Sequence, residues 1–412
     1  MAAVAGLRGT GDWSQDERPK NFREKILFLD PNADSPIFAL SGKAGKYVVN
    51  DPEYSWWCET SNIVRLHVNG ALIAGDTTIT VDSVDPTSTT LSAPWGVASH
   101  LKPGDVLLVE PATLNSFNPE LIRVTEVLSD TVFTVQRGIG GSSAASIGNG
   151  SFLLLLSSAY GEGTSSPRAV SRNPTKFSNY TQIFKDAYEL TKTADATVAR
   201  TGDPWSNDKK RKMFDHARGI EHTLLYQVNK QETTDSNGKP LRYTAGMRGF
   251  IPSTNVKYFT AAVTTDDLLT FLEPAFSFSL PGSGDTRIGF TGNLGLAELG
   301  KIIRNDDSVM MQMGEKITMW GIDFRELIMP WGRLLLKGHP LLSRSATFRK
   351  SLYVCDFSAL KWSPLTGRDT KPYDDVQNKD EDLRRGYVQT EGGWFVDGGG
   401  LTMAILDNIS ST

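Results

Sequence analysis

One segment of this chain has the pattern of a long helix, and it restricts how its surroundings can fold. Between Ser206 and Lys230 the apolar residues recur at spacings of four, three, four and four, which puts them on one helical face. These residues are Met213, Ala217, Ile220, Leu224 and Val228. Asp203 and Pro204 just before it are typical of a helix start. The sequence therefore predicts a helix over 206–230 whose apolar stripe must be covered by other elements.

Strand signals dominate the chain around this helix. Residues 75–150 are rich in Thr, Ser, Val and Gly and show almost no helical periodicity. Four runs in this region are typical of strands: Thr77–Val81, Asp105–Val109, Leu121–Val127 and Thr131–Val135. A long helix among many short strands predicts the α+β class. We also predict that residues 75–150 form a small inserted β module.

The N-terminal segment, residues 1–45, has the composition of an arm. Glycines interrupt its start, and a short amphipathic helix follows with Phe22, Ile26 and Leu29 on one face. Asp30-Pro31 ends that helix, because proline disfavours helix at the residue before it. One short helix cannot bury an apolar face alone. The arm therefore needs a surface on the same body or on a neighbouring molecule.

The overall charge and the cysteine content exclude several classes of protein. The chain has 43 Lys and Arg against 47 Asp and Glu, with no basic stripe of the kind that grips nucleic acid. Two cysteines, Cys58 and Cys355, are too few for a disulfide scaffold and are expected as thiols. The longest apolar runs, such as Phe152–Leu156, are too short to cross a bilayer. We expect a soluble protein made in the cytoplasm.

Motifs for catalysis or for metal and cofactor binding are missing from the sequence. Of five histidines only His216 and His222 are near each other, and a spacing of six puts them on different helix faces. The glycine-rich stretch Gly138–Ser143 lacks the lysine of a phosphate loop, and no Gly-x-Ser-x-Gly elbow occurs. We therefore predict no catalytic residue, no cofactor and no metal, and a structural protein rather than an enzyme. An unrecognised hydrolase would need a cluster of titratable groups in one pocket.

The order of these elements resembles the Hong Kong 97 type major capsid fold of tailed phages. An arm leads to an extended loop, a long helix follows, and a glycine-rich return to a final strand ends the chain. Several stretches are similar to one branch of that fold, the SU-ten-like major head proteins. These stretches are Arg8–Trp13, Arg18–Ile26, Asn173–Phe184, Arg200–Asp203 and Asp235–Ile251.

This resemblance covers almost the whole chain and implies a division into parts. The implied parts are an N-terminal arm at 1–45, an extended loop at 46–74 and 151–168, the inserted β module at 75–150, a peripheral domain at 169–260 and 340–412 that includes a spine helix at 206–230, and an axial domain at 261–339. The chain shows no long helical extension before its arm. A separate scaffolding protein is therefore expected.

The resemblance also implies the function. The chain would be a major capsid protein that assembles with itself into pentamers and hexamers of an icosahedral shell around double-stranded DNA, which it contacts weakly and non-specifically. The other expected partners are a scaffolding protein, a portal and a decoration protein. No contact with a membrane is expected. The expected location is the virion, after assembly in the bacterial host cytoplasm.

Aromatic and large apolar residues dominate protein interfaces, so they are the predicted subunit contacts. The predicted contact residues are Phe22, Ile26, Leu29, Trp56 and Trp57. Packing inside the same subunit remains the alternative for each of them. The alternative function is a minor virion, tail or receptor- or carbohydrate-binding protein, which would be present in few copies per particle.

Overall fold

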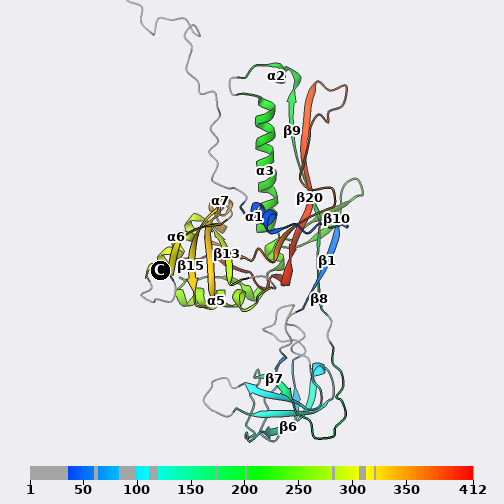
Figure 1. The fold of residues 1–412 in the computed structure, drawn as a ribbon, viewed down its shortest axis with the longest axis vertical. Helices are drawn as coiled ribbons and strands as arrows, with labels where there is room; N and C mark the ends of the chain where they lie inside the picture. The colour runs from blue at the N-terminus through cyan, green and yellow to red at the C-terminus, as the bar shows by residue number, and fades with distance from the viewer. Residues whose placement is uncertain are drawn as a thin grey trace, which may run out of the picture.

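The structure is a computed structural model that describes most of the chain after the arm. The described residues are 36–59, 64–82, 98–110, 119–171, 174–199, 202–280, 284–305, 312–319 and 322–411. The predicted contact residues Phe22, Ile26 and Leu29 lie outside them. Figure 1 shows an elongated molecule with a long helix and two long strands at one end, a mixed sheet with helices beside their base, and a separate group of strands at the other end.

The long helix, α3, spans Pro204–Tyr226, and its start follows the local sequence. The side chain of Asp203 accepts hydrogen bonds from the backbone N–H groups of Trp205 and Ser206, both at 3.2 Å, and Pro204 occupies the first turn. The helix ends earlier than predicted, because Gln227 is already extended at the C-cap.

The buried face of α3 differs from the predicted apolar stripe. Met213 is 44% exposed, and Val228 lies beyond the helix and is 47% exposed. The buried residues are Trp205, His216, Ile220, Glu221, Leu224 and Leu225. Ile220 and Leu224 of the predicted stripe are buried, but a count of apolar residues could not include His216 and Glu221, whose hydrogen-bond partners come from distant segments.

Alongside α3 run two long antiparallel strands, β9 (Gln182–Thr191) and β20 (Leu383–Val396) (Figure 1). Their pairing continues from Gln182 opposite Gly392 to Thr191 opposite Leu383. His216 of α3 fastens the helix to both strands. Its Nδ1 lies 2.6 Å from Asp186 Oδ2 on β9, and its Nε2 lies 2.7 Å from Thr390 Oγ1 on β20. Two short strands, β18 (Leu360–Pro364) and β19 (Lys371–Tyr373), complete this sheet on β20.

A seven-stranded mixed sheet forms the centre of the body. In spatial order its strands are β12 (Val256–Tyr258), β21 (Ala404–Asp407), β17 (Leu352–Cys355), β13 (Thr286–Thr291), β16 (Gly332–Gly338), β15 (Ile322–Met329) and β14 (Gln312–Met319). Both faces are covered, as the alternation of β17 shows: Leu352 and Val354 pack toward α5 (Thr265–Ser277) and α6 (Asn293–Asn305), whereas Tyr353 and Cys355 belong to the core that includes α3.

This sheet corrects the predicted division of the chain. Residues 261–339 do not form a separate unit, because β12, β17 and β21 lie outside that range and pair within the same sheet. The chain after residue 340 returns to place β17 antiparallel beside β13. The body also contains the helices α1 (Pro36–Ala44), α2 (Lys192–Ala196), α4 (Met247–Phe250) and α7 (Pro340–Arg344) and the strands β10 (Gln231–Thr234) and β11 (Pro240–Tyr243).

A two-stranded ribbon leaves the body toward the separate group of strands in Figure 1. It consists of β1 (Glu53–Cys58) and β8 (Thr175–Tyr180), paired antiparallel from Glu53 opposite Tyr180 to Cys58 opposite Thr175. The predicted second strand, at 151–168, is therefore wrong. The sequence pattern could identify extended segments but could not identify which pair would hydrogen-bond.

The separate group of strands is a small barrel built from residues 64–158. Its strand order is β2 (Arg65–His67), β7 (Phe152–Ser158), β4 (Asp105–Glu110), β5 (Leu121–Val127), β6 (Val132–Ile139) and β3 (Thr78–Thr80). The barrel closes where Asn69 N donates to Thr80 O and Asp82 N donates to His67 O, both at 2.9 Å. Because β2 and β7 belong to this sheet, the predicted bounds of 75–150 were too narrow at both ends.

Candidate subunit-contact surfaces

The ribbon separates its side chains into two faces, as the alternation of a strand requires. Along β1, Tyr54 and Trp56 are each only 6% exposed, whereas Trp57 is 62% exposed. The two adjacent tryptophans were both predicted as subunit contacts, but their surroundings in the structure differ. One packs against the body of its own subunit and the other faces outward.

Trp56 is an internal anchor of the ribbon. Its ring centroid lies 4.6 Å from that of Phe395, 5.6 Å from that of Phe250 and 6.2 Å from that of Phe177. Its indole N–H donates to the carbonyl of Val396 at 3.1 Å. The prediction of Trp56 as a subunit contact is corrected accordingly, because its surface is used inside the subunit.

Two further buried groups hold the ribbon on β20. The Tyr54 hydroxyl donates to the carbonyl of Trp394 at 2.8 Å, and burial raises the pKa of this hydroxyl above its usual range, so it remains a donor. Asn179 of β8 donates from Nδ2 to the same carbonyl at 2.8 Å and accepts from Ala245 N at 2.8 Å. Gly393 allows this approach, since a Cβ there would lie 2.5 Å from the Tyr54 hydroxyl.

Trp57 is the exposed aromatic residue of the outer face. It pairs with Lys176 across the ribbon, and the Lys176 ammonium lies 6.0 Å from the ring centroid, at the limit of a cation–π contact. An exposed indole on a narrow ribbon is a large apolar area that the described part of this subunit leaves uncovered. Trp57 remains a predicted contact residue.

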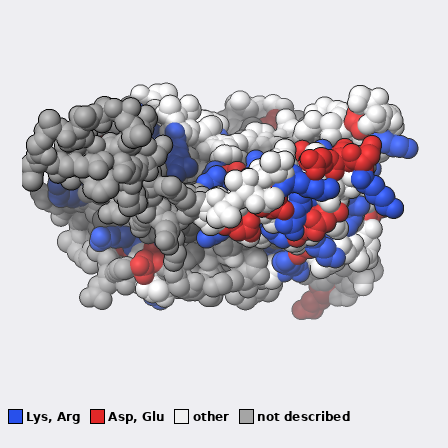
Figure 2. Space-filling view, turned by 90° about the horizontal axis from the view of Figure 1, so that it is seen from above, with Lys and Arg blue, Asp and Glu red and all other residues white. Residues whose placement is uncertain are grey.

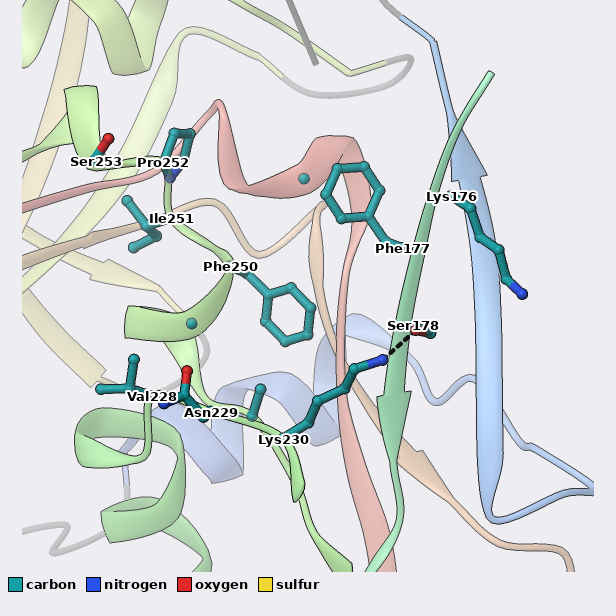
Figure 3. A pocket seen from close by; sticks show the side chains of 13 residues that line it. Lys176, Phe177, Ser178, Val228, Asn229, Lys230, Phe250, Ile251, Pro252 and Ser253 are labelled. Atoms are coloured by element: carbon teal, nitrogen blue, oxygen red, sulfur yellow. Dashed lines mark hydrogen bonds between the residues drawn. The ribbon is translucent and has the colours of Figure 1, made fainter. Parts of the chain in front are cut away.

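A cavity of about 580 Å³ lies between β8 and the segment around α4. Figure 3 shows the rings of Phe177 and Phe250 beside it, with Ile251 and Pro252 on the other side. Lys230 extends along its edge and donates to the Ser178 hydroxyl. The lining contains no Asp, Glu, His or Cys, so this cavity does not provide the paired acid and base that hydrolysis needs.

Two histidines and one cysteine of the body are buried as part of its packing. His216 and His339 are buried and hydrogen-bonded, and Cys355 is fully buried in the core. Among the residues that the structure describes, no group of three or more His, Cys, Asp and Glu is placed to hold a metal ion. No helix in the described part of the chain is long and apolar enough to span a bilayer.

A fully buried carboxylate joins three distant parts of the chain, and the sequence patterns gave no sign of it. Glu221 of α3 accepts hydrogen bonds from the N–H groups of Ile37, at 3.0 Å, and Phe38, at 2.7 Å, in the first turn of α1. It also lies 2.7 Å from Nε2 of His339, whose Nδ1 accepts from Leu341 N at 3.2 Å. This assignment makes Nε2 the protonated nitrogen and Glu221 its acceptor.

The end of the molecule that carries α2 has charges of both signs close together. Figure 2 shows Lys and Arg intermixed with Asp and Glu on the described residues of this end. The pairs include Arg384 with Asp375 at 2.8 Å and Arg385 with Glu189 at 2.9 Å. The described residues on this face thus do not form the single-sign patch that tight nucleic-acid binding requires.

The likeness to known proteins extends over nearly the whole chain. The model of the SU10 (SU-ten) major capsid protein family matches residues 6–408. The major capsid protein of Pseudomonas phage PaMx41 is 28% identical over 378 residues, which are 90% of this chain and 84% of that protein.

Two solved structures, a phage capsid and an encapsulin complex, are also similar in outline. The capsid of cyanophage A-1(L) is 9% identical with a TM-score of 0.41, covering 96% of this chain and 99% of that one. The SrpI encapsulin of Synechococcus elongatus PCC 7942 is 11% identical with a TM-score of 0.42, covering 58% and 76%. Because both TM-scores lie below 0.5, we base the assignment on the family match. With its match from residue 6 to residue 408, this chain belongs to the SU10 major capsid protein family.

Proposed function

We propose that this major capsid protein closes its shell by placing the outer face of the β1–β8 ribbon on a sister copy. As a member of its family the chain is a structural subunit of the icosahedral virion shell of a tailed phage. The ribbon supports the proposal because it leaves the body as a narrow two-stranded arm with Trp57 uncovered. Burial of an indole supplies association energy at about 25 cal/mol per Å² before entropic costs.

The parts of the body correspond to the parts of a Hong Kong 97 type subunit in this proposal. We assign α3 as the spine helix, the sheet containing β9 and β20 as the peripheral domain, and the seven-stranded sheet with α5 and α6 as the axial region. The ribbon β1–β8 takes the role of the extended loop, and the barrel at 64–158 is an insertion at its tip. Family membership and the order of these elements support the assignment.

The further partners follow from this role. Pentamers and hexamers of the chain would enclose double-stranded DNA, and a scaffolding protein, a portal and a decoration protein would act beside them. The intermixed charges support a weak, non-specific contact with DNA, since a container that gripped its genome would hinder packaging.

The test separates the two tryptophans. We expect Trp57→Ala to leave subunit stability within about 0.5 kcal/mol of wild type, since it is exposed, but to reduce the yield of closed shells at least tenfold. Shells are counted by electron microscopy after expression with the phage's scaffolding protein, and stability is measured by urea denaturation. Trp57→Phe should recover part of the yield because it keeps an aromatic ring.

Two controls make this result specific. Leu128→Ala removes another exposed apolar side chain, 55% exposed on the barrel, and should leave the shell yield unchanged. Trp56→Ala should instead destabilise the subunit itself by about 3–5 kcal/mol. A normal yield of shells from Trp57→Ala would reject the ribbon contact, and a wild-type chain that never forms shells would reject the function.

A further inference from the structure

The cavity between β8 and the segment around α4 has two kinds of lining. Phe177, Phe250 and Ile251 supply an apolar wall (Figure 3). Lys176 and Lys230 bring two ammonium groups, and the described residues that line the cavity include no Asp or Glu. Its volume of about 580 Å³ lies within the range of pockets that hold a ligand. The cavity thus fits an occupant that carries both an aromatic ring and a carboxylate.

Lys230 is the cation that is placed to bind such a carboxylate. It is exposed, its ammonium group donates to the Ser178 hydroxyl, and it lies 5.4 Å from the ring centroid of Tyr180. These two neutral groups hold the side chain along the edge of the cavity without neutralising its charge. A carboxylate that reaches this edge would therefore gain a charge-assisted hydrogen bond.

The outer face of β1 carries the matching pair of groups. Strand alternation places Glu53, Ser55 and Trp57 on this face, and all three are exposed. Glu53 and Trp57 are four residues apart, a distance of about 13 Å along a strand. Because β1 is paired with β8 over this length, the carboxylate and the indole are presented in line on one stiff element.

The two surfaces do not meet within one subunit. Trp57 is 62% exposed, and neither it nor Glu53 lines the cavity. Each copy of the chain therefore carries a projecting face and a cavity of complementary chemistry. A surface pair of this kind allows identical copies to bind one another.

We propose that the cavity beside β8 receives the outer face of β1 from a second copy of the chain. The inference rests on the proposed function, in which this face contacts a sister copy, and it names the receiving surface. Trp57 of the second copy packs against Phe177 and Phe250. Glu53 of that copy forms an ion pair with Lys230.

The two contacts together fix the direction in which one ribbon lies on the next. The indole needs the aromatic wall, whereas the carboxylate needs the edge that carries Lys230. Reversing the strand would bring the Glu53 carboxylate against the aromatic wall, where it would lose water without gaining a cation. The charge pair thus selects one orientation, and the indole supplies most of the buried apolar area.

The first experiment identifies the surface that touches position 57 in assembled shells. The photo-reactive amino acid p-benzoylphenylalanine takes the place of Trp57, and a small fraction of these chains is co-assembled with isotope-labelled wild-type chains. Irradiation, trypsin digestion and mass spectrometry should join position 57 to the labelled peptide that follows Arg248 and ends at Lys257, which contains Phe250. The label assigns this peptide to another copy.

A matched control and two contrary outcomes make this experiment decisive. The same photo-reactive amino acid at Leu128, 55% exposed on the barrel, should not reach the labelled peptide that contains Phe250. Cross-links from position 57 to other labelled peptides alone would assign Trp57 a different receiving surface. The absence of any cross-link to a labelled chain would likewise overturn the proposal.

The second experiment reverses the proposed ion pair. Glu53→Lys and Lys230→Glu should each lower the yield of closed shells at least tenfold, because like charges then meet. Both changes in one chain should restore part of the yield, since every copy again presents opposite charges. Glu162→Lys and Lys239→Glu make the same changes at other exposed sites and should leave the yield unchanged. Urea denaturation checks that each variant is folded.

The outcomes also separate this inference from the function on which it rests. If Trp57→Ala lowers the shell yield while Lys230→Glu leaves it at the wild-type level, the ribbon still contacts a sister copy but this cavity does not receive it. Losses in both single charge variants without recovery in the double variant would exclude the pairing of Glu53 with Lys230. Normal shells from Trp57→Ala would instead reject the ribbon contact itself.

Discussion

The barrel is built from one stretch of the sequence, whereas the body joins segments that lie far apart in the sequence. Among the described residues, those of the buried barrel core all lie within 64–153, and β4, β5 and β6 pair in chain order. The body instead joins segments from both ends of the chain. Glu221 binds residues 184 positions earlier and 118 positions later, and the central sheet contains β12 and β21 as neighbours. The barrel is thus a local folding unit, whereas the body requires almost the complete chain.

The largest expected effect comes from removing the last strand. Truncation after Gly400 deletes β21, which pairs with both β12 and β17 and supplies the buried residues Ala404, Ile405 and Leu406. We expect the body to lose its folded structure entirely while the barrel remains folded. Native-state proteolysis with mass spectrometry would detect a resistant fragment spanning residues 64–158. A truncated chain in which both parts melt together would contradict the comparison.

The next prediction concerns the hydrogen bonds by which Glu221 joins distant segments of the body. Glu221→Ala leaves the first-turn N–H groups of α1 and Nε2 of His339 without their buried acceptor. We expect a loss of about 3–5 kcal/mol in the unfolding free energy of the body, because buried polar groups lose a charged partner. Urea denaturation followed by tryptophan fluorescence reports it. An unchanged denaturation midpoint would show that the hydrogen bonds of Glu221 contribute little to the stability of the body.

A matched substitution in the barrel should act only there. Arg137 forms a buried pair with Glu120, its Nη2 lying 2.8 Å from Glu120 Oε2, and donates to the carbonyls of Ile73 and Asp76 at 3.2 Å. Arg137→Met should cost the barrel about 3 kcal/mol and leave the body unchanged. Exchange rates of buried amides, read separately in barrel and body, distinguish the two parts. An equal loss in both would show that they unfold as one.

The smallest effect is a pH dependence near the C-terminus of the body. Hydrogen bonds from Lys301 and from Ser411 lower the pKa of Glu298 to about 2. A carboxyl whose pKa is lowered by folding adds stability above its unfolded pKa, and this is lost as pH falls from about 4 to about 2. The stability difference between wild type and Glu298→Gln should be full at neutral pH and vanish across that window. A difference that stays constant would exclude Glu298 as its source.

Local sequence determined several elements of this protein by itself. Asp203 and Pro204 set the start of α3, because a cap needs only its own neighbours. Alternating apolar residues placed β5 at Leu121–Val127 as predicted. The turn at Ser129 between β5 and β6 is likewise local, since its hydroxyl accepts from Val132 N at 3.1 Å.

Only the tertiary structure decided which segments pair and which side of each is covered. Period-two alternation places Trp56 and Trp57 on opposite faces, but β20 determined that Trp56 is the buried one. The partner of β1 proved to be β8, and β7 joined the barrel instead, because an extended segment has no local signal for its distant partner. Glu221 remained unrecognised for the same reason. Its burial is favourable only because α1 and His339 bring donors from opposite ends of the chain.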